Sequence, residues 1–424
     1  MKVGIIGSGG REHALALKLF NSYSCDKVYC FPGNPGTASF AKNLNVSPED
    51  FEKLAETIIL NGIDFVVIGP EKHLSDGLTD YLQTKGIKVF GPTSAAARIE
   101  SDKAFAKQLM LSYKIPTASF RTFTADQHSA ALEFCNKIGY PSVIKASGLA
   151  AGKGVVIANN PNEAKSAIDS MFFEKMFGES GETIVVEEFM TGLEASVFAI
   201  CDGNNFVLLP PAQDHKRIGD NDTGKNTGGM GAYAPAKIVT KAHLQKIEEQ
   251  IVSPVLKALS DKGSKFVGCL FCGLMIEGDV VRVVEFNARF GDPETQAILN
   301  LLEGDFCELL YSCATGELKN RTITINGNAS VCVIAASGGY PDKFNKGFEI
   351  KGLDRVSSDI YVFHSGTALK DDKIISNGGR VLGVTSVDST GNLKSAIEMA
   401  YEAISKISFD KMYYRKDIGS KGLN

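Results

Sequence analysis

The distribution of hydrophobic residues divides the start of the chain into short apolar runs separated by amphipathic segments. The runs KVGIIG, VYCF, FVVIGP and IKVFGP alternate with stretches of helical spacing that begin at Arg11 and lie near residues 48–61 and 75–85. Short apolar strands separated by helices are typical of a parallel sheet with helices on both faces. We therefore predict that residues 1–100 form an α/β domain with a doubly wound parallel sheet.

A different pattern, strict alternation, marks residues 280–296, which read VVRVVEFNARFGDPETQ. Alternation places Glu285 and Asn287 on one face of a strand, together with Val281 and Val283. A turn containing Gly and Pro follows and carries Arg289, Asp292 and Glu294. Carboxylate and amide oxygens suit a divalent cation, and arginine suits an anionic substrate. The segment predicts a metal and anion site, although an amphipathic edge strand with a solvated turn would show the same pattern.

A glycine-containing hairpin is predicted at residues 140–158, YPSVIKASGLAAGKGVVIA. Strands around 142–146 and 154–158 flank a loop with Lys145 at its base and Lys153 near its tip, so backbone amides and ammonium groups could offset the charge of a polyphosphate. The loop is not a Walker A motif, because Ser147 stands where the first glycine belongs and Gly154 follows the lysine. A flexible hairpin without a ligand is the alternative.

Two further segments carry polar residues between apolar strands. TIVVEEFMTGLEASVFAI, residues 183–200, predicts a hinge between two sheets that could present backbone groups to a purine and a carboxylate to ribose. Residues 213–231 are polar and contain five glycines. Long segments without secondary structure are usually functional or disordered, so we expect an active-site loop here. We expect its His215 to be solvated and without a catalytic role.

Two glycine-rich turns at residues 7–12 and 32–37 could hold a phosphate at a helix N-terminus. A dinucleotide site is disfavoured, because Glu12 replaces the third glycine of GxGxxG and no ribose-binding acid ends the second strand. Ordinary turn chemistry explains both loops equally well. Near the other end, a third α/β unit starts at about residue 328, with a hairpin expected in IISNGGRVLGV and a helix at 392–406.

Composition limits the class of protein. The chain has 424 residues, which suggests about three domains, and it is 44% hydrophobic and 22% charged with a net charge of −4. This composition lacks the basic excess of a nucleic-acid-binding protein. The first ten residues, MKVGIIGSGG, have the pattern of neither a signal peptide nor a membrane span. The nine scattered cysteines fit reduced thiols. We therefore expect a cytoplasmic protein without membrane or nucleic-acid partners. The Cys269–Cys272 pair lies in an apolar run and is predicted to be buried.

Together the segments resemble the ATP-grasp superfamily and, within it, the glycinamide ribonucleotide synthetases, or phosphoribosylamine–glycine ligases. The matching motifs are GSGGREHAL, GNPGT, GPE, the 142–157 hairpin, QDHKR with DTGKNTGGMGAY, EFNARFGDPETQ, ASGGYP, FHSGT and NGGRVLGV. RFGDPE is the most specific of them, since many ATP-grasp enzymes share only the Glu-x-Asn strand. The resemblance implies a Rossmann-like (pre-ATP-grasp) domain at 1–100, an ATP-grasp domain at 101–325 with a mobile lid at about 118–190, and a C-terminal domain at 326–424.

The resemblance also implies a reaction and a set of residues. ATP, glycine and 5-phosphoribosylamine would give glycinamide ribonucleotide, ADP and phosphate through a glycyl phosphate, a step of purine synthesis. The ATP phosphates would be contacted by Lys103, Lys145, Gly152, Lys153 and Gly154. The hinge for adenine and ribose would consist of Glu187, Glu188, Met190 and Glu194. The ligands of Mg²⁺ or Mn²⁺ would be Glu285 and Asn287. Glycine and the acyl phosphate would be held by Arg289, Asp292 and Asp214, and phosphoribosylamine by Gly9, Asn34, Gly36 and Lys216.

Two departures from the family pattern and three rival interpretations remain. The strand before Glu-x-Asn reads Gly273-Leu274-Met275-Ile276 and lacks a second carboxylate, and His73 replaces a proline after GPE. The rivals are another ATP-grasp ligase of purine synthesis, an NAD-linked oxidoreductase and an inactive nucleotide sensor. The oligomeric state stays open, with a monomer among the possibilities.

Overall fold

The N-terminal part of the chain forms a five-stranded parallel sheet, as the apolar runs predicted. The computed structural model describes residues 1–150, 154–174, 178–319 and 321–423. The sheet has the order β3-β2-β1-β4-β5, and all its pairs are parallel. Its strands are β1 (Lys2–Gly7), β2 (Lys27–Pro32), β3 (Lys42–Asn43), β4 (Phe65–Ile68) and β5 (Lys88–Phe90).

Helices cover both faces of this sheet. Val3 and Ile5 of β1 pack in one core with α1 (Gly10–Phe20), whereas Ile6 faces a second core with α2 (Phe51–Leu60) and α4 (Leu78–Thr84). Strands buried on both faces are apolar throughout, which explains the continuous apolar runs. The short helix α3 (Glu71–Ser75) follows β4.

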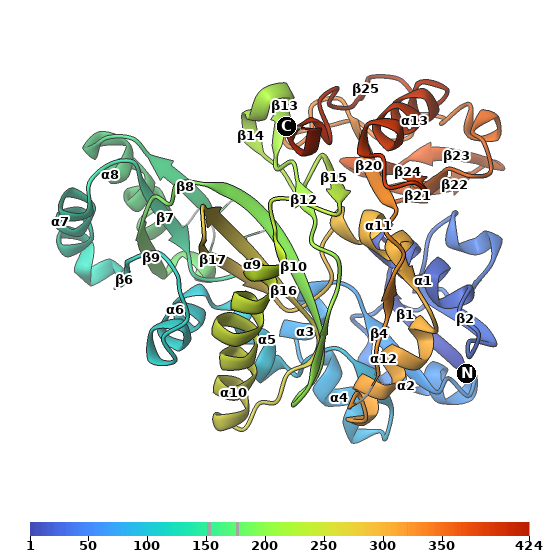
Figure 1. Ribbon diagram of the computed structural model, residues 1–424, viewed down its shortest axis with the longest axis horizontal. Helices are drawn as coiled ribbons and strands as arrows, with labels where there is room; N and C mark the ends of the chain where they lie inside the picture. The colour runs from blue at the N-terminus through green and yellow to red at the C-terminus, as the bar shows by residue number, and fades with distance from the viewer. Residues whose placement is uncertain (151–153, 175–177, 320, 424) are drawn as a thin grey trace.

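A small antiparallel sheet, which we call the lid sheet, stands at the left of Figure 1. It has the order β6-β9-β7-β8 and packs with two helices around its own core. Its elements are β6 (Phe120–Thr124), α7 (His128–Ile138), β7 (Ser142–Ala146), β8 (Val155–Ala158), α8 (Pro161–Phe172) and β9 (Thr183–Glu188). The pairing of β7 with β8 confirms the predicted glycine hairpin.

The central sheet follows the lid sheet directly in the chain, so residues 189–192 connect two sheets as predicted. Its antiparallel order is β11-β10-β16-β17, with β10 (Leu193–Asp202), β11 (Phe206–Leu208), β16 (Val267–Glu277) and β17 (Val280–Asn287). The helices α5 (Ser94–Ser101), α6 (Lys103–Ser112), α9 (Lys241–Ile247) and α10 (Ser253–Asp261) belong to this region. A π-helical segment, Glu248–Val252, lies between α9 and α10.

The alternation in β17 is interrupted by a β-bulge. Gly273 lies opposite Glu285 and Leu274 opposite Val283, so Val284 is the extra residue. Val281 and Val283 are buried before the bulge, and Phe286 is buried after it. Glu285 and Asn287 still share one face, but the expectation that they share it with the two valines is wrong, because the bulge shifts the alternation by one residue.

The C-terminal sheet, at the upper right of Figure 1, contains residues from two distant parts of the chain. Its order is β12-β15-β20-β24-β21, with β25 on β20, and α13 packs on it. The elements are β12 (Gln213–Asp214), β15 (Gly231–Ala234), β20 (Ala329–Ser337), β21 (Tyr361–His364), β24 (Arg380–Asp388), α13 (Leu393–Ser405) and β25 (Met412–Tyr413). The 213–231 segment is therefore not structureless, since its ends are strands and β13 (Arg217–Gly219) pairs with β14 (Thr223–Asn226) inside it.

The hairpin predicted around Asn377-Gly378 is wrong. β23 (Lys373–Ser376) pairs with the preceding β22 (Thr367–Lys370), while β24 pairs with β20 and β21. The Asn-Gly turn connects two sheets instead, because a local turn signal does not decide which strands pair. The remaining elements are α11 (Glu294–Ile298), α12 (Phe306–Thr315), β18 (Leu302–Glu303) and β19 (Thr324–Ile325).

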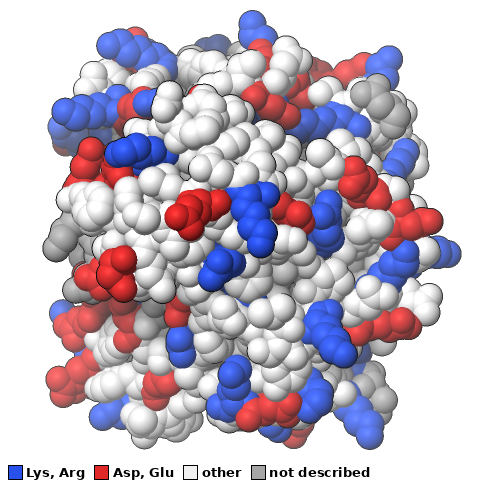
Figure 2. Space-filling view, turned by 90° about the vertical axis from the view of Figure 1, so that its left-hand side faces the viewer, with Lys and Arg blue, Asp and Glu red and all other residues white. Residues whose placement is uncertain are grey.

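Surface and core agree with the composition. On the face that carries the lid sheet, acidic and basic side chains are intermixed, and its described residues form no continuous basic surface (Figure 2). Among the described residues, no helix has the length and apolar character needed to cross a bilayer. Cys269 and Cys272 face different cores on opposite sides of β16, so they cannot share a ligand.

Candidate active site

Two lysines share one buried carboxylate where the lid sheet meets the central sheet. Lys145 in β7 and Lys107 in α6 each place Nζ 3.1 Å from Glu187 Oε2 in β9. Val143 lies opposite Glu187, so Lys145, two residues further on, is a diagonal neighbour on the same face. The Lys145 ammonium also donates to the carbonyl of Val284 at 3.2 Å. Lys107 was not identified from the sequence, although it lies one helical turn after Lys103.

Lys103 begins α6 beside the base of the glycine hairpin. Its Nζ donates to the Gly148 carbonyl at 3.1 Å, and its backbone N–H donates to the Ser147 carbonyl at 2.8 Å. Burial lowers the pKa of Lys103, while the charge of Glu285 opposes this shift. The Gly154 carbonyl accepts from Ala146 and closes the hairpin. The predicted contacts at Gly152 and Lys153 lie outside the described residues.

The hinge residues differ in their surroundings. Met190 is buried, and Glu188 accepts from the Ser119 backbone at 3.0 Å and lies 3.4 Å from an Arg282 nitrogen. Glu194, further along, lies 2.6 Å from Lys216 Nζ. The positive charge of Lys216 lowers the pKa of Glu194. The predicted ribose-binding carboxylate of the hinge, Glu194, therefore pairs with Lys216, a predicted substrate residue of the 213–231 segment.

The two predicted metal ligands, Glu285 and Asn287, lie next to each other on one face of β17. Among the described residues, neither side chain has a hydrogen-bond or ion-pair partner, so their oxygens are available to a hard cation. The charge of Glu285 acts on Lys103, Asp214 and Lys216, which places the predicted metal, ATP and substrate residues in one neighbourhood. No group of three or more His, Cys, Asp or Glu side chains in the described residues could hold a metal. Mg²⁺ fits such a sparse donor set, since it usually retains waters.

Arg289 is held between two carboxylates that sequence reasoning missed. Its Nη2 lies 3.1 Å from Glu100 and its Nε lies 3.3 Å from Glu71. Despite burial, the charges of Glu100 and Glu71 raise the pKa of Arg289. Glu100 also accepts from the Ala288 backbone at 2.7 Å. These contacts fix the guanidinium at the end of β17, and only long-range packing brings the two acids to it.

A second set of acids lies beside Lys216. Glu294 is 4% exposed and Asp214 is 8% exposed. Burial, followed by the charge of Asp214, raises the pKa of Glu294 to about 7. Burial also raises the pKa of Asp214. Ser196 donates to Glu294 at 3.3 Å. The site therefore has two carboxyl groups whose pKa is raised by burial, although the charge of Lys216 opposes both shifts.

The N-terminal loops pack against the C-terminal sheet. Asn34 donates to the carbonyls of Ser8 (2.9 Å) and His364 (2.8 Å), and its oxygen accepts from the backbone of Gly36 (2.9 Å). Gly9 N–H donates to Glu12 at 2.7 Å. The Asn34 side chain is therefore occupied with holding the loops, so we expect it to shape the substrate site rather than to bind a phosphate.

Arg380 connects the C-terminal sheet to Asp292, which is predicted to help hold the substrate glycine. Its Nη2 lies 3.2 Å from the Asp292 carboxylate, and its Nη1 donates to the carbonyls of Asp292 (2.8 Å) and Gly228 (2.6 Å). The sequence offered NGGRVLGV as a motif but no partner for its arginine. Asp292 is thus oriented by a residue 88 positions away in the chain.

The expectation that His215 is solvated is wrong. Its side chain is buried, and neither ring nitrogen has a partner among the described residues. Burial, with the nearby charges of Lys421 and Arg415, lowers the pKa of His215 to about 4. Its flanking charged residues suggested a surface position, but pairing of β12 with β15 places the ring inside.

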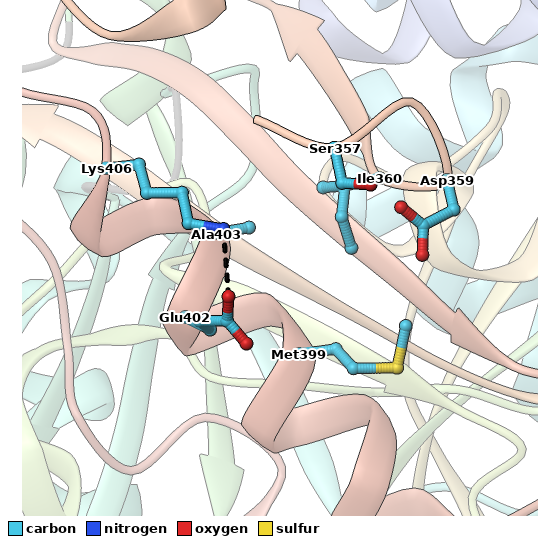
Figure 3. Close-up of a pocket in the computed structure, with 7 residues that line it drawn as sticks. All are labelled: Ser357, Asp359, Ile360, Met399, Glu402, Ala403 and Lys406. Atoms are coloured by element: carbon cyan, nitrogen blue, oxygen red, sulfur yellow. Dashed lines mark hydrogen bonds and ion pairs between the residues drawn. The ribbon is translucent and has the colours of Figure 1, made fainter. Parts of the chain in front are cut away.

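A hollow of about 200 Å³ on the C-terminal unit contains none of the predicted site residues. Figure 3 shows that Met399, Glu402 and Lys406 of the α13 region face Ser357 and Asp359 across it. Lys406 and Glu402 pair at 2.8 Å. The hollow is lined by ordinary surface groups, and we assign it no function.

Comparison with known proteins decides the family. Three family models match in order: phosphoribosylglycinamide synthetase N domain at residues 1–100, its ATP-grasp (A) domain at 101–295 and its C domain at 330–421. The chain belongs to the phosphoribosylglycinamide synthetase family. It is 47% identical to the phosphoribosylamine–glycine ligase of Caldanaerobacter subterraneus, over 99% of this chain and 100% of that one. It is 46% identical to that of Synechocystis, with 100% of both chains covered.

Solved structures agree with this assignment. The phosphoribosylamine–glycine ligase of Thermotoga maritima superimposes with a TM-score of 0.86 at 33% identity, covering 98% of this chain and 100% of that one. A biotin carboxylase from Campylobacter jejuni has a TM-score of 0.74 at 16% identity, covering 100% of this chain and 95% of that one. The second likeness shows the fold alone, and it confirms the ATP-grasp architecture.

Proposed function

We propose that this chain joins glycine to 5-phosphoribosylamine at the expense of ATP, giving glycinamide ribonucleotide, ADP and phosphate in purine biosynthesis. The observation that carries the proposal is the match of residues 1–295 and 330–421 to the three domains of phosphoribosylglycinamide synthetase. The charge of Glu285 acts on Lys103, Asp214 and Lys216, which agrees with a shared site. A carboxylate is a poor electrophile until one of its oxygens becomes a phosphate leaving group. The γ-phosphoryl of ATP therefore passes first to a glycine oxygen, and the amine then attacks the carbonyl carbon and releases phosphate.

The lysines act at the nucleotide. Phosphoryl transfer depends mainly on positioning and charge neutralisation, and Lys103 and Lys145 supply both. The hairpin with Gly152, Lys153 and Gly154 covers the phosphates in this proposal. Glu187, Glu188 and Met190 form the adenine side of the hinge, and Glu194, oriented by Lys216, faces the ribose.

Glu285 and Asn287 hold Mg²⁺ or Mn²⁺ in this proposal, because their oxygens are hard ligands and pair with no described residue. The cation supplies charge neutralisation for the phosphate oxygens. The neighbouring strand offers no second carboxylate here, since Gly273 lies opposite Glu285 and a Cβ at Gly273 would meet Glu285 Cγ at 3.2 Å.

The amino-acid end of the site follows β17. Arg289 suits the carboxylate of glycine, and Asp214 suits its ammonium group. Asp292, oriented by Arg380, faces the acyl phosphate region, and Lys216 lies on the substrate side of the ribose carboxylate. Gly9, Asn34 and Gly36 shape the loops for phosphoribosylamine. Any side chain at Gly36 would meet His13 Nδ1 at 2.6 Å and His364 Cδ2 at 2.7 Å.

The wider organisation belongs to the same proposal. We divide the chain into an N-terminal domain (1–100), an ATP-grasp domain (101–325) with its lid at about 118–190, and a C-terminal domain (326–424). We place the enzyme in the cytoplasm, where it acts on small molecules, and its oligomeric state stays open.

One assay tests the function. ADP release is measured with ATP, glycine and freshly generated phosphoribosylamine, and each substrate is omitted in turn. We expect release to require both glycine and the amine. Release that is independent of glycine, or supported by bicarbonate or formate instead, would assign the chain to another ATP-grasp ligase.

A further inference from the structure

Lys107 is a second buried lysine that none of the roles above uses. Its side chain is 3% exposed, its Nζ lies 3.1 Å from Glu187 Oε2, and it donates to Thr117 Oγ1 at 2.7 Å. Burial of a charged amine costs free energy unless the amine is paired, so the partner of Lys107 indicates which role the lysine has. Its only carboxylate contact among the described residues is the same oxygen that Lys145 approaches.

The charges of these three groups do not cancel. Glu187 carries one negative charge, and two ammonium groups share its Oε2 oxygen. Among the described residues, the other contact of Lys145 is the neutral carbonyl of Val284. Within this set of three groups one positive charge is left, which an anionic ligand can offset. If Lys107 were absent, Glu187 and Lys145 would form a neutral pair.

We infer that Lys107 is a positioning residue that neutralises Glu187 and so leaves the charge of Lys145 available to the phosphates of ATP. The inference rests on the proposed function only in naming ATP as the anion. Lys107 touches no substrate in this arrangement. It acts through Glu187 and Lys145.

The contacts of Lys107 also fix the place where that charge is presented. Thr117 accepts from Lys107 and donates to the Val283 carbonyl at 2.6 Å, while Lys145 donates to the next carbonyl along β17. The two lysines thus join β9 of the lid sheet to β17 immediately before Glu285. Lys103 and Lys107 lie on one side of α6, since residues four apart share a helix face. One lysine contacts the hairpin and the other contacts the hinge strand.

The inference is tested by binding measurements that need neither glycine nor phosphoribosylamine. Calorimetry with a non-hydrolysable ATP analogue and with adenosine compares wild type, Lys107→Met and Lys107→Arg. Loss of a charged contact predicts that Kd for the analogue rises roughly ten- to a hundredfold in Lys107→Met. Kd for adenosine should stay within about twofold, because adenosine carries no phosphate for Lys145 to hold. Lys107→Arg should recover most of the affinity, and Lys257→Met, at an exposed lysine of α10, should match wild type.

A double-mutant cycle separates this role from simple structural support. In a Glu187→Gln background there is no carboxylate to neutralise, so adding Lys107→Met should change Kd for the analogue less than twofold. The Glu187→Gln, Lys107→Met double variant contains no unpaired carboxylate at this position. The comparison of this double variant with Glu187→Gln therefore tests the inference even if Lys107→Met alone fails to fold. Equal losses for adenosine and the ATP analogue, or a Lys107→Met effect that persists in Glu187→Gln, would overturn the inference. A wild type that binds the analogue but releases no ADP with both substrates would instead overturn the proposed function.

Discussion

Individual carboxylates in this site differ mainly in which cations compensate them. Glu187 has two lysines, Glu100 has Arg289, and Asp292 has Arg380, whereas Glu285 has no such partner among the described residues. A carboxylate that forms no ion pair with a described residue inside the proposed ATP site is free to bind a cation that arrives with the substrate. This contrast is the strongest residue-scale argument for metal binding at Glu285.

Replacement of Glu285 by alanine should abolish most activity while the fold survives. A ligand at the edge of the site contributes more to the transition state than to the core. We expect glycine-dependent ADP release to fall by at least about a hundredfold, with Tm changed by only a few degrees. Glu398→Ala, at an exposed glutamate of α13, serves as the control. Near-normal turnover in a folded Glu285→Ala protein would disprove the assignment.

Glu294 should make stability depend on pH. Its folded pKa of about 7 lies above its usual value of 4.5, so the native state keeps a proton that the unfolded chain releases. The stabilisation is complete below about pH 4.5 and is lost as pH rises through 7, by at most about 3 kcal/mol. Urea denaturation is measured without ligands at pH 5 and at pH 8. Between these two pH values, the free energy of unfolding should decrease less for Glu294→Gln than for wild type. Parallel decreases in the two proteins would contradict this.

At the scale of elements, the sequence predicted what local patterns determine. The parallel N-terminal strands and the β7–β8 hairpin were both predicted, because each is encoded by a continuous run or a neighbouring turn. The bulge at Val284 and the partners of β24 were not, since both depend on strands distant in the chain.

The same limit applies to the site. Lys103, Lys145, Glu285 and Asn287 were predicted from motifs, and in the structure the charge of Glu285 acts on Lys103. Three residues were missed because each acts through a partner that is distant in the chain. Lys107 pairs with Glu187, 80 residues away, Glu100 with Arg289, 189 residues away, and Arg380 with Asp292, 88 residues away. A lysine one turn after Lys103 was the only signal for the first of them.

The loop element that holds Gly36 should tolerate no side chain. Asn34 fixes this loop against β21, and a Cβ at Gly36 would overlap with the buried rings of His13 and His364. Overpacking of this kind costs about 1–3 kcal/mol, so Gly36→Ala should lower stability and raise KM for phosphoribosylamine more than KM for ATP. Ala38→Ser, an exposed change in the same turn, is the control. Equal changes in both KM values would argue against a substrate role for this loop.

At the scale of the whole molecule, the site lies where four sheets supply one residue set. The N-terminal loops touch the C-terminal sheet through Asn34 and His364, and the C-terminal sheet reaches the end of β17 through Arg380. The lid sheet differs, because its core is separate and its links to the central region run through the hinge, the two lysines on Glu187 and the contacts of Lys103 with the hairpin. An arrangement of this kind favours motion of the lid sheet as a body.

ATP binding should therefore increase the protection of lid-sheet amides from hydrogen exchange more than that of amides elsewhere in the protein. Binding adds contacts between Lys145, the hinge and the phosphates, which joins the lid sheet to the central sheet. We expect amides of β7, β8 and β9 to exchange at least about tenfold more slowly with a non-hydrolysable ATP analogue, since closure removes low-energy openings. Amides of β10 and β16, which lie in the larger cores, provide the internal control and should change little. Adenosine alone should give a smaller effect, because it lacks the phosphates that reach Lys145. Equal exchange in β7, β8 and β9 with and without the analogue would show that the lid sheet is already fixed in the free protein.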